Sequence, residues 1–183
     1  MRIVIPFILS VFFLSFTSGD QIKFSKRNVR EGIKIKIPEN FYKMPNKDIL
    51  ERYRSYKLPI AMYSSEDRLM ELGISISDNF WSGNDLELLM EFQKSNIMAL
   101  YDKVKITKEG IRKVHKYDMA YFEIETDTRY ARTFEKKYSL LHYAVVDNRV
   151  IVFNFSCPVG RKDEWSEHAW KIMDSIKMAK KVF

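Results

Sequence analysis

The sequence has little cysteine, glycine and proline, and each shortage excludes a class of protein. It contains one Cys, 6 Gly and 5 Pro among 183 residues. One cysteine cannot form an intramolecular disulfide, so the fold is not a small secreted scaffold held by disulfides. The low glycine and proline content, with 46% hydrophobic residues, excludes a disordered or low-complexity chain. A single domain of this length can instead bury an ordinary hydrophobic core.

The long apolar run of the sequence lies at its N-terminus. It covers residues 3–16, follows the positive charge of Arg2 and ends in the small polar residues 17–19. This order is typical of a secretory signal peptide, and the run is short for a membrane span. We therefore predict a cleaved signal peptide over residues 1–19 and one domain over residues 20–183. An uncleaved membrane anchor is the alternative.

The single cysteine also bears on where the protein works. A secreted animal protein of this size usually carries several cysteines, whereas a bacterial periplasmic or extracellular protein needs none. We therefore expect an exported bacterial protein. The net charge of +7 favours solubility and weak attraction to anionic surfaces. Export argues against nucleic acid as a partner.

The first half of the chain predicts short strands and two helices. Alternation of isoleucine with lysine over residues 33–37 predicts a half-buried strand that Pro38 ends. A short helix begins at Asn46 as N-cap, and strands cover residues 60–65 and 70–77. A long helix follows over residues 84–104. We expect Asn84 to be its N-cap, Glu87 to complete a capping box, and one side to be buried. The residues of that buried stripe are Leu86, Leu89, Met90, Ile97, Leu100, Tyr101 and Val104.

The second half predicts antiparallel strands followed by a helix. We expect a weak hairpin or bulge around Glu109–Gly110 and a strong hairpin turn at Asp147–Asn148. The strand before that turn is apolar on both faces, which indicates a central strand. Residues 161–181 read as a terminal helix. The fold class is therefore α+β, an α/β/α sandwich with a central antiparallel sheet and helices packed on its faces.

Three segments carry a resemblance to a known family. They are "IKIKIPENFYKM", "IAMYSSEDRLMELGISIS" with the helix after it, and "RVIVFNFSCPVGRKDEWSEHAWKIMDSIKM". Their order over residues 30–180 resembles the PsbP-like superfamily, which includes a photosystem II subunit, a Ran-binding nuclear import factor and small bacterial envelope proteins. The resemblance implies an α/β/α sandwich and a role as adaptor, assembly factor or chaperone, not as enzyme. It rests on structural segments, so no functional residue is carried over.

Cys157 is the first candidate for chemistry. A catalytic cysteine needs an imidazole or a helix N-terminus that stabilises its thiolate, and His115, His142 and His168 are the available histidines. However, Cys157 shares one face of its strand with apolar residues, and free cysteine is among the most buried residue types. We favour a core role for Cys157.

Other catalytic and metal motifs are absent from the sequence. The three histidines are far apart and show no metal-ligand spacing, and there is no nucleophile elbow or phosphate loop. Paired carboxylates of a glycoside hydrolase remain open, because such pairs need not be neighbours in sequence. We predict no cofactor and no metal.

Two features suggest an interaction surface. The first is a group of basic residues on the predicted strands: Lys103, Lys105, Lys108, Arg112, Lys113, Lys116, Arg129, Arg132, Lys136 and Lys137. They could meet anionic lipid or an acidic partner, or they form an ordinary solvated strand face. The second is the pair Phe80–Trp81 before the long helix, which either anchors a partner or folds over the core.

Together these features predict an exported, non-enzymatic binding, adaptor or assembly protein of the bacterial envelope. We expect a monomer or weak dimer that contacts an envelope protein or an anionic membrane. The proposed contact residues are Arg112, Lys113, Arg129, Arg132, Phe80 and Trp81. The alternative is a small-ligand carrier or hydrolase with a pocket between sheet and helix.

Overall fold

The computed structural model describes residues 22–30, 32–53, 58–81, 85–130 and 133–179. The predicted signal peptide, residues 1–19, lies outside these ranges. Among the described residues, no helix is both long and apolar enough to cross a membrane.

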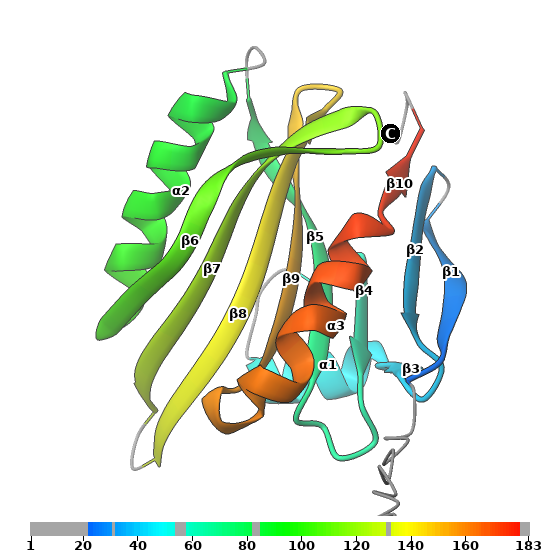
Figure 1. Ribbon diagram of the computed structural model, residues 1–183, viewed down its shortest axis with the longest axis vertical. Coiled ribbons are helices and arrows are strands. Elements are labelled where there is room, and N and C mark those ends of the chain that lie inside the picture. The colour runs from blue at the N-terminus through cyan, green and yellow to red at the C-terminus, as the bar shows by residue number, and fades with distance from the viewer. Residues whose placement is uncertain (1–21, 31, 54–57, 82–84, 131–132, 180–183) are drawn as a thin grey trace, which may run out of the picture.

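A seven-stranded antiparallel sheet forms the centre of the molecule (Figure 1). Strands β6, β7, β8 and β9 follow one another in the chain and pair in the same order, so they form a continuous series of antiparallel neighbours in the sheet. In order across the sheet, the strands are β3 (Tyr42–Lys43), β4 (Ala61–Ser64), β5 (Glu71–Phe80), β9 (Arg149–Pro158), β8 (Thr133–Val146), β7 (Tyr117–Tyr130) and β6 (Lys103–Val114).

A second, smaller sheet packs beside the first. It has the order β1 (Phe24–Arg30), β2 (Ile33–Pro38), β10 (Lys177–Met178). Within the described ranges, three helices complete the fold: α1 (Asn46–Tyr53), α2 (Leu86–Leu100) and α3 (Lys162–Asp174), the last preceded by one 3₁₀ turn, η1 (Val159–Arg161). The alternating isoleucines of β2 point into the core, as their period of two predicts.

Helices cover both faces of the large sheet, because its central strands are apolar on both sides. In β8, Leu140 and Ala144 belong to the core that α3 covers, whereas Tyr143 belongs to the core that α2 covers. Successive strand residues point to opposite faces, so α2 and α3 lie on different sides of the sheet (Figure 1). The predicted α+β class and α/β/α sandwich are confirmed.

The β8–β9 turn forms where the sequence predicts it. Asp147 and Asn148 have φ angles of 50° and 57°, the left-handed region that a two-residue hairpin turn requires. Of the two alternatives at Glu109–Gly110, the hairpin is wrong, because β6 continues through both residues. The strand is bulged nearby, since its register with β7 shifts between Ile106 and Lys108. Gly110 instead lies opposite Tyr121, and a Cβ there would stand 3.4 Å from the tyrosine ring. The missing side chain leaves room for that ring.

Two helix ends also differ from expectation. The N-cap of α2 is Asp85, whose carboxylate accepts a hydrogen bond of 2.9 Å from the Leu88 amide, and the expected cap Asn84 lies outside the described residues. The helix ends at Leu100, so Val104 belongs to β6. At the C-terminus α3 ends at Asp174, because Lys177–Met178 pair with β2 as strand β10.

Candidate protein-interaction surface

Exposed apolar side chains gather around α2. Eight large hydrophobic residues are exposed among those described, and six of them lie on α2 or on the strands next to it. Such a concentration on one side of a molecule indicates a contact surface more strongly than single exposed residues do. The six are Phe80 at the end of β5, Leu88, Phe92, Met98 and Leu100 on α2, and Ile111 on β6.

Helical spacing explains why α2 has two apolar sides. Leu89 and Ile97 are buried against the sheet, as the stripe in the sequence predicts. Leu88 and Phe92 are one turn apart on the side away from the sheet, where Leu88 is 59% exposed. Leu100, which the stripe placed in the core, is 72% exposed because the helix ends there. That expectation was wrong.

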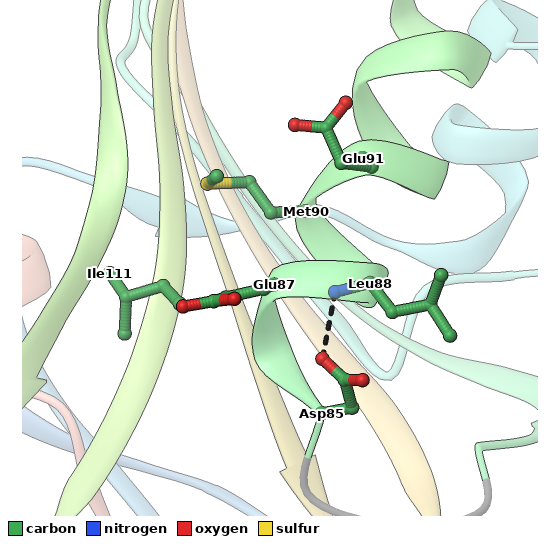
Figure 2. Close-up of a pocket in the computed structure, with 6 residues that line it drawn as sticks. All are labelled: Asp85, Glu87, Leu88, Met90, Glu91 and Ile111. Carbon is green, nitrogen blue, oxygen red and sulfur yellow. Dashed lines mark hydrogen bonds between the residues drawn. The ribbon is translucent and has the colours of Figure 1, made fainter.

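A depression of about 610 Å³ lies between α2 and β6 (Figure 2). Met90 and Ile111 face each other across it, and Glu87 extends between helix and strand, while Leu88 points away on the other side of the helix. Its lining residues are Asp85, Glu87, Leu88, Met90, Glu91 and Ile111. We call the exposed apolar residues Leu88, Phe92, Met98, Leu100 and Ile111, together with the carboxylates of Asp85, Glu87 and Glu91, the α2 surface.

The α2 surface is acidic although the chain is basic. Among the described residues, no basic side chain forms an ion pair with Asp85, Glu87 or Glu91. The nearby Lys94 is paired with Glu109 of β6 at 2.7 Å and also interacts electrostatically with Glu91. The surface therefore presents three carboxylates that form no ion pair among the described residues, in a protein whose net charge is +7.

Phe80 and Trp81 differ in their exposure to solvent. Phe80 is 72% exposed, with the Arg149 guanidinium 5.6 Å from the centre of its ring. Trp81 packs with the core under α2, and its ring lies 5.9 Å from that of Phe92. Trp81 thus supports the α2 surface from beneath, whereas Phe80 is available to a partner at its edge.

The basic residues on the strands are largely compensated by carboxylates. Arg112 pairs with Asp174 of α3 and lies over the Trp170 ring at 5.0 Å, and Lys113 pairs with Asp118 at 3.6 Å. Lys105, Lys108 and Lys136 likewise pair with acidic residues of β7. Exposed pairs of this kind contribute little to stability but remove the excess positive charge of the face.

Arg129 and Arg132 remain predicted contact residues. Arg129 pairs through its backbone with Phe134 near the end of the β7–β8 hairpin, and Arg132 lies outside the described residues. The hypothesis that these two arginines meet an anionic surface stays a prediction.

Cys157 lies in the core, on the strand face that its sequence position predicts. It is fully buried, and burial raises the pKa of its thiol to about 12, so the thiol stays protonated at neutral pH. A nucleophilic cysteine requires the opposite shift. The three histidines also occupy separate places: His115 in the exposed β6–β7 turn, His142 in the core and His168 beside Phe24 and Trp165.

The strongly shifted titratable groups do not line the depression. Burial lowers the pKa of His142 to about 3, with Arg112 contributing further, and burial also raises the pKa of Tyr138 and Tyr143. These shifts come chiefly from desolvation inside the core and not from charges gathered at a cleft. Among the described residues, no three His, Cys, Asp or Glu side chains are grouped so as to hold a metal ion.

The sequence did not identify α2 as the candidate surface. The apolar stripe that includes Leu89 and Ile97 predicted the buried side of α2. Leu88 and Phe92 show helical spacing as well, on the exposed side of the same helix. A helix with apolar residues on both sides is expected to be covered on both sides. That second stripe is the signal that sequence reasoning missed.

Comparison with known proteins supports the fold. No protein-family model matches the sequence, and no curated protein matches it. Among solved structures, the chain is similar to cyanobacterial PsbP (CyanoP) from Synechocystis sp. PCC 6803, with a TM-score of 0.60, 12% identity, and coverage of 89% of this chain and 96% of that chain. It is similar to the Saccharomyces cerevisiae Ran-binding protein Mog1p, with a TM-score of 0.56, 9% identity, and coverage of 86% and 96%.

A third similar structure is LpqN of Mycobacterium tuberculosis, described as involved in cell envelope biogenesis. Its TM-score is 0.54 at 9% identity, with coverage of 86% of this chain and 92% of LpqN. Identities this low establish a shared architecture alone. The fold of the chain is therefore PsbP-like, as the three sequence segments implied.

Proposed function

We propose that the protein is an exported, non-enzymatic binding or adaptor protein, and that it contacts its partner through the α2 surface. The observation that carries this proposal is that, of the eight exposed large apolar residues in the described part of the chain, six lie around one helix. Exposed apolar side chains on a folded monomer lose contact with water when a partner covers them, and this burial drives association.

The PsbP-like fold supports a binding role. Of the similar structures, Mog1p is a Ran-binding protein and LpqN is involved in cell envelope biogenesis. The N-terminal apolar run and the single cysteine support export to a bacterial envelope or beyond it. The rival function is a small-ligand carrier or hydrolase with a pocket between sheet and helix, and the complete burial of Cys157 opposes the version in which this thiol is the nucleophile.

Capture from envelope extracts tests the contact surface. The protein is immobilised and compared with the variant L88Q/M98Q, which removes two exposed apolar side chains of α2 and changes no charge. The matched control is L50Q/L69Q, which replaces two apolar residues of similar exposure on the α1 side, at 47% and 45%. Each substitution lies at the surface, so the free energy of unfolding should change by less than about 1 kcal/mol.

We expect wild type and L50Q/L69Q to retain the same proteins and L88Q/M98Q to lose them. Equal capture by all three proteins, with unchanged circular dichroism and melting temperature, would remove the α2 surface from consideration.

A further inference from the structure

We infer that the partner presents a protein segment that carries apolar side chains together with Lys or Arg, and that this segment lies along the exposed side of α2. This inference rests on the proposed function and adds the chemistry of the occupant.

The shape of the surface favours an elongated segment. α2 has 15 residues, which corresponds to a length of about 22 Å at 1.5 Å per residue. Its exposed apolar residues run from Leu88 near the first turn to Leu100 at the last, and the depression beside β6 lies next to the first half. A partner helix of three to four turns would cover this length, as amphipathic helices do in apolar grooves.

The charges on the surface determine which segment fits. Glu87 and Glu91 border the depression, and Asp85 stands at its end as the helix cap. Apolar residues flanked by carboxylates that form no ion pair complement a segment in which basic residues flank apolar ones. The net charge of the whole chain is +7, so its overall field repels a basic segment, whereas the carboxylates of the α2 surface attract it locally.

The same charges oppose the other occupants of an apolar face. An anionic lipid surface would meet Glu87 and Glu91 where their side chains border the apolar residues. A second copy of the chain, joined by twofold symmetry through α2, would place the same acidic patch against itself. Neither arrangement compensates the carboxylates.

Two designed helical peptides of 15 residues provide the probe. Both have Leu at the same positions, and the remaining positions are Lys in one and Glu in the other. Each carries a fluorophore, and its anisotropy is measured against increasing protein at about 50 mM salt, where charge effects are weakly screened. Non-specific attraction to a protein of charge +7 would favour the Glu peptide, so preference for the Lys peptide reports on the local surface.

We expect wild type to bind the Lys peptide at least tenfold more tightly than the Glu peptide. The variant E87K/E91K should reverse this preference. The control E51K/E167K makes the same charge change at two exposed carboxylates of α1 and α3, whose side chains are 67% and 83% exposed, and should bind as wild type does. L88Q/M98Q should weaken binding of the Lys peptide.

Several outcomes would overturn the inference. Preference of the wild type for the Glu peptide, or identical binding by E87K/E91K and E51K/E167K, contradicts the charge argument. Two other outcomes would show a different occupant of the α2 surface. The first is sedimentation of wild type, but not of L88Q/M98Q, with phosphatidylglycerol vesicles. The second is a dimer of wild type, but not of L88Q/M98Q, in sedimentation equilibrium.

The two proposals fail separately. If L88Q/M98Q loses the captured proteins but wild type shows no preference for the Lys peptide, the contact surface stands and the basic partner is wrong. If L88Q/M98Q captures as wild type does, the contact surface itself is wrong.

Discussion

Acidification should destabilise the fold through His142. This side chain is fully buried between β7 and α3, where its ring lies 5.7 Å from that of Tyr121 and 5.6 Å from that of Trp170. Burial favours the neutral imidazole, and the positive charge of Arg112 favours it further, so the pKa of His142 falls from 6.5 to about 3.

The direction in which stability changes with pH follows from proton binding by the folded and unfolded chain. The unfolded chain binds a proton on His142 below pH 6.5, whereas the folded protein binds it only near pH 3. The contribution of His142 is therefore complete above pH 6.5 and is lost as the pH falls from 6.5 toward 3. At pH 5, which is 1.5 pH units below the unfolded pKa, the loss is about 2 kcal/mol at 1.36 kcal/mol per unit.

Urea unfolding from pH 8 to pH 5 measures this loss, with His142→Phe as the variant. Phenylalanine retains a ring between Tyr121 and Trp170 and cannot take up a proton. Its absolute stability does not matter, because the difference between wild type and variant is compared across pH. We expect the free energy of unfolding of the wild type, minus that of the variant, to fall by about 2 kcal/mol between pH 8 and pH 5.

His115→Asn is the matched control, since it removes an exposed imidazole from the β6–β7 turn and asparagine tolerates the φ of 54° found there. If the free energy of unfolding changes with pH by the same amount in the wild type and in His142→Phe, the burial argument is refuted.

Two further predictions concern the core. Glu123 is buried and accepts a hydrogen bond of 3.1 Å from the Tyr138 hydroxyl, so Glu123→Ala leaves that hydroxyl without this partner and should cost about 1–3 kcal/mol in urea unfolding. Lys108→Ala removes only the exposed partner of the same carboxylate and should cost less than about 1 kcal/mol; equal losses would contradict this difference in burial. Cys157 should not react with a thiol reagent at pH 8 until the protein is unfolded, and rapid reaction of the native protein would show that the thiol is accessible.

The sequence predicted those parts of the fold that depend on local patterns. The alternation in β2 and the opposite faces of β8 follow from the two-residue period of a strand. The turn at Asp147–Asn148 follows from the residues that tolerate a left-handed backbone. The position of Cys157 in the core follows from the same period in β9.

The errors occurred where distant residues decide the structure. Lys177 and Met178 continue a helical pattern, but pairing with Lys34 and Ile33 of β2 makes them a strand. The strand β6 continues through Gly110 because Glu109 and Gly110 pair with Phe122 and Tyr121 of β7. Neither neighbour is visible in the local pattern, and tertiary contacts override weak local preferences.

The candidate surface was predicted only in part. Phe80 is exposed, as a residue that anchors a partner must be. Trp81 instead packs over the core, which was the other interpretation of this pair. The lack of an ion pair at the carboxylates of α2 could not be recognised from the sequence, because the pairing of Lys94 with Glu109 of β6 depends on how the helix lies on the sheet. The acidic partners of the strand lysines, such as Asp118 for Lys113, likewise become apparent only when β6 and β7 are aligned.

The most direct test of the α2 surface is photo-crosslinking in cells that produce the protein. A photoreactive phenylalanine analogue replaces Leu88 or Met98 on α2, and in separate experiments the apolar residues Leu50 or Leu69, whose exposure is similar. Covalent adducts with a second protein should form from positions 88 and 98 and should be absent from positions 50 and 69. Adducts from positions 50 or 69 alone would contradict the proposed contact surface.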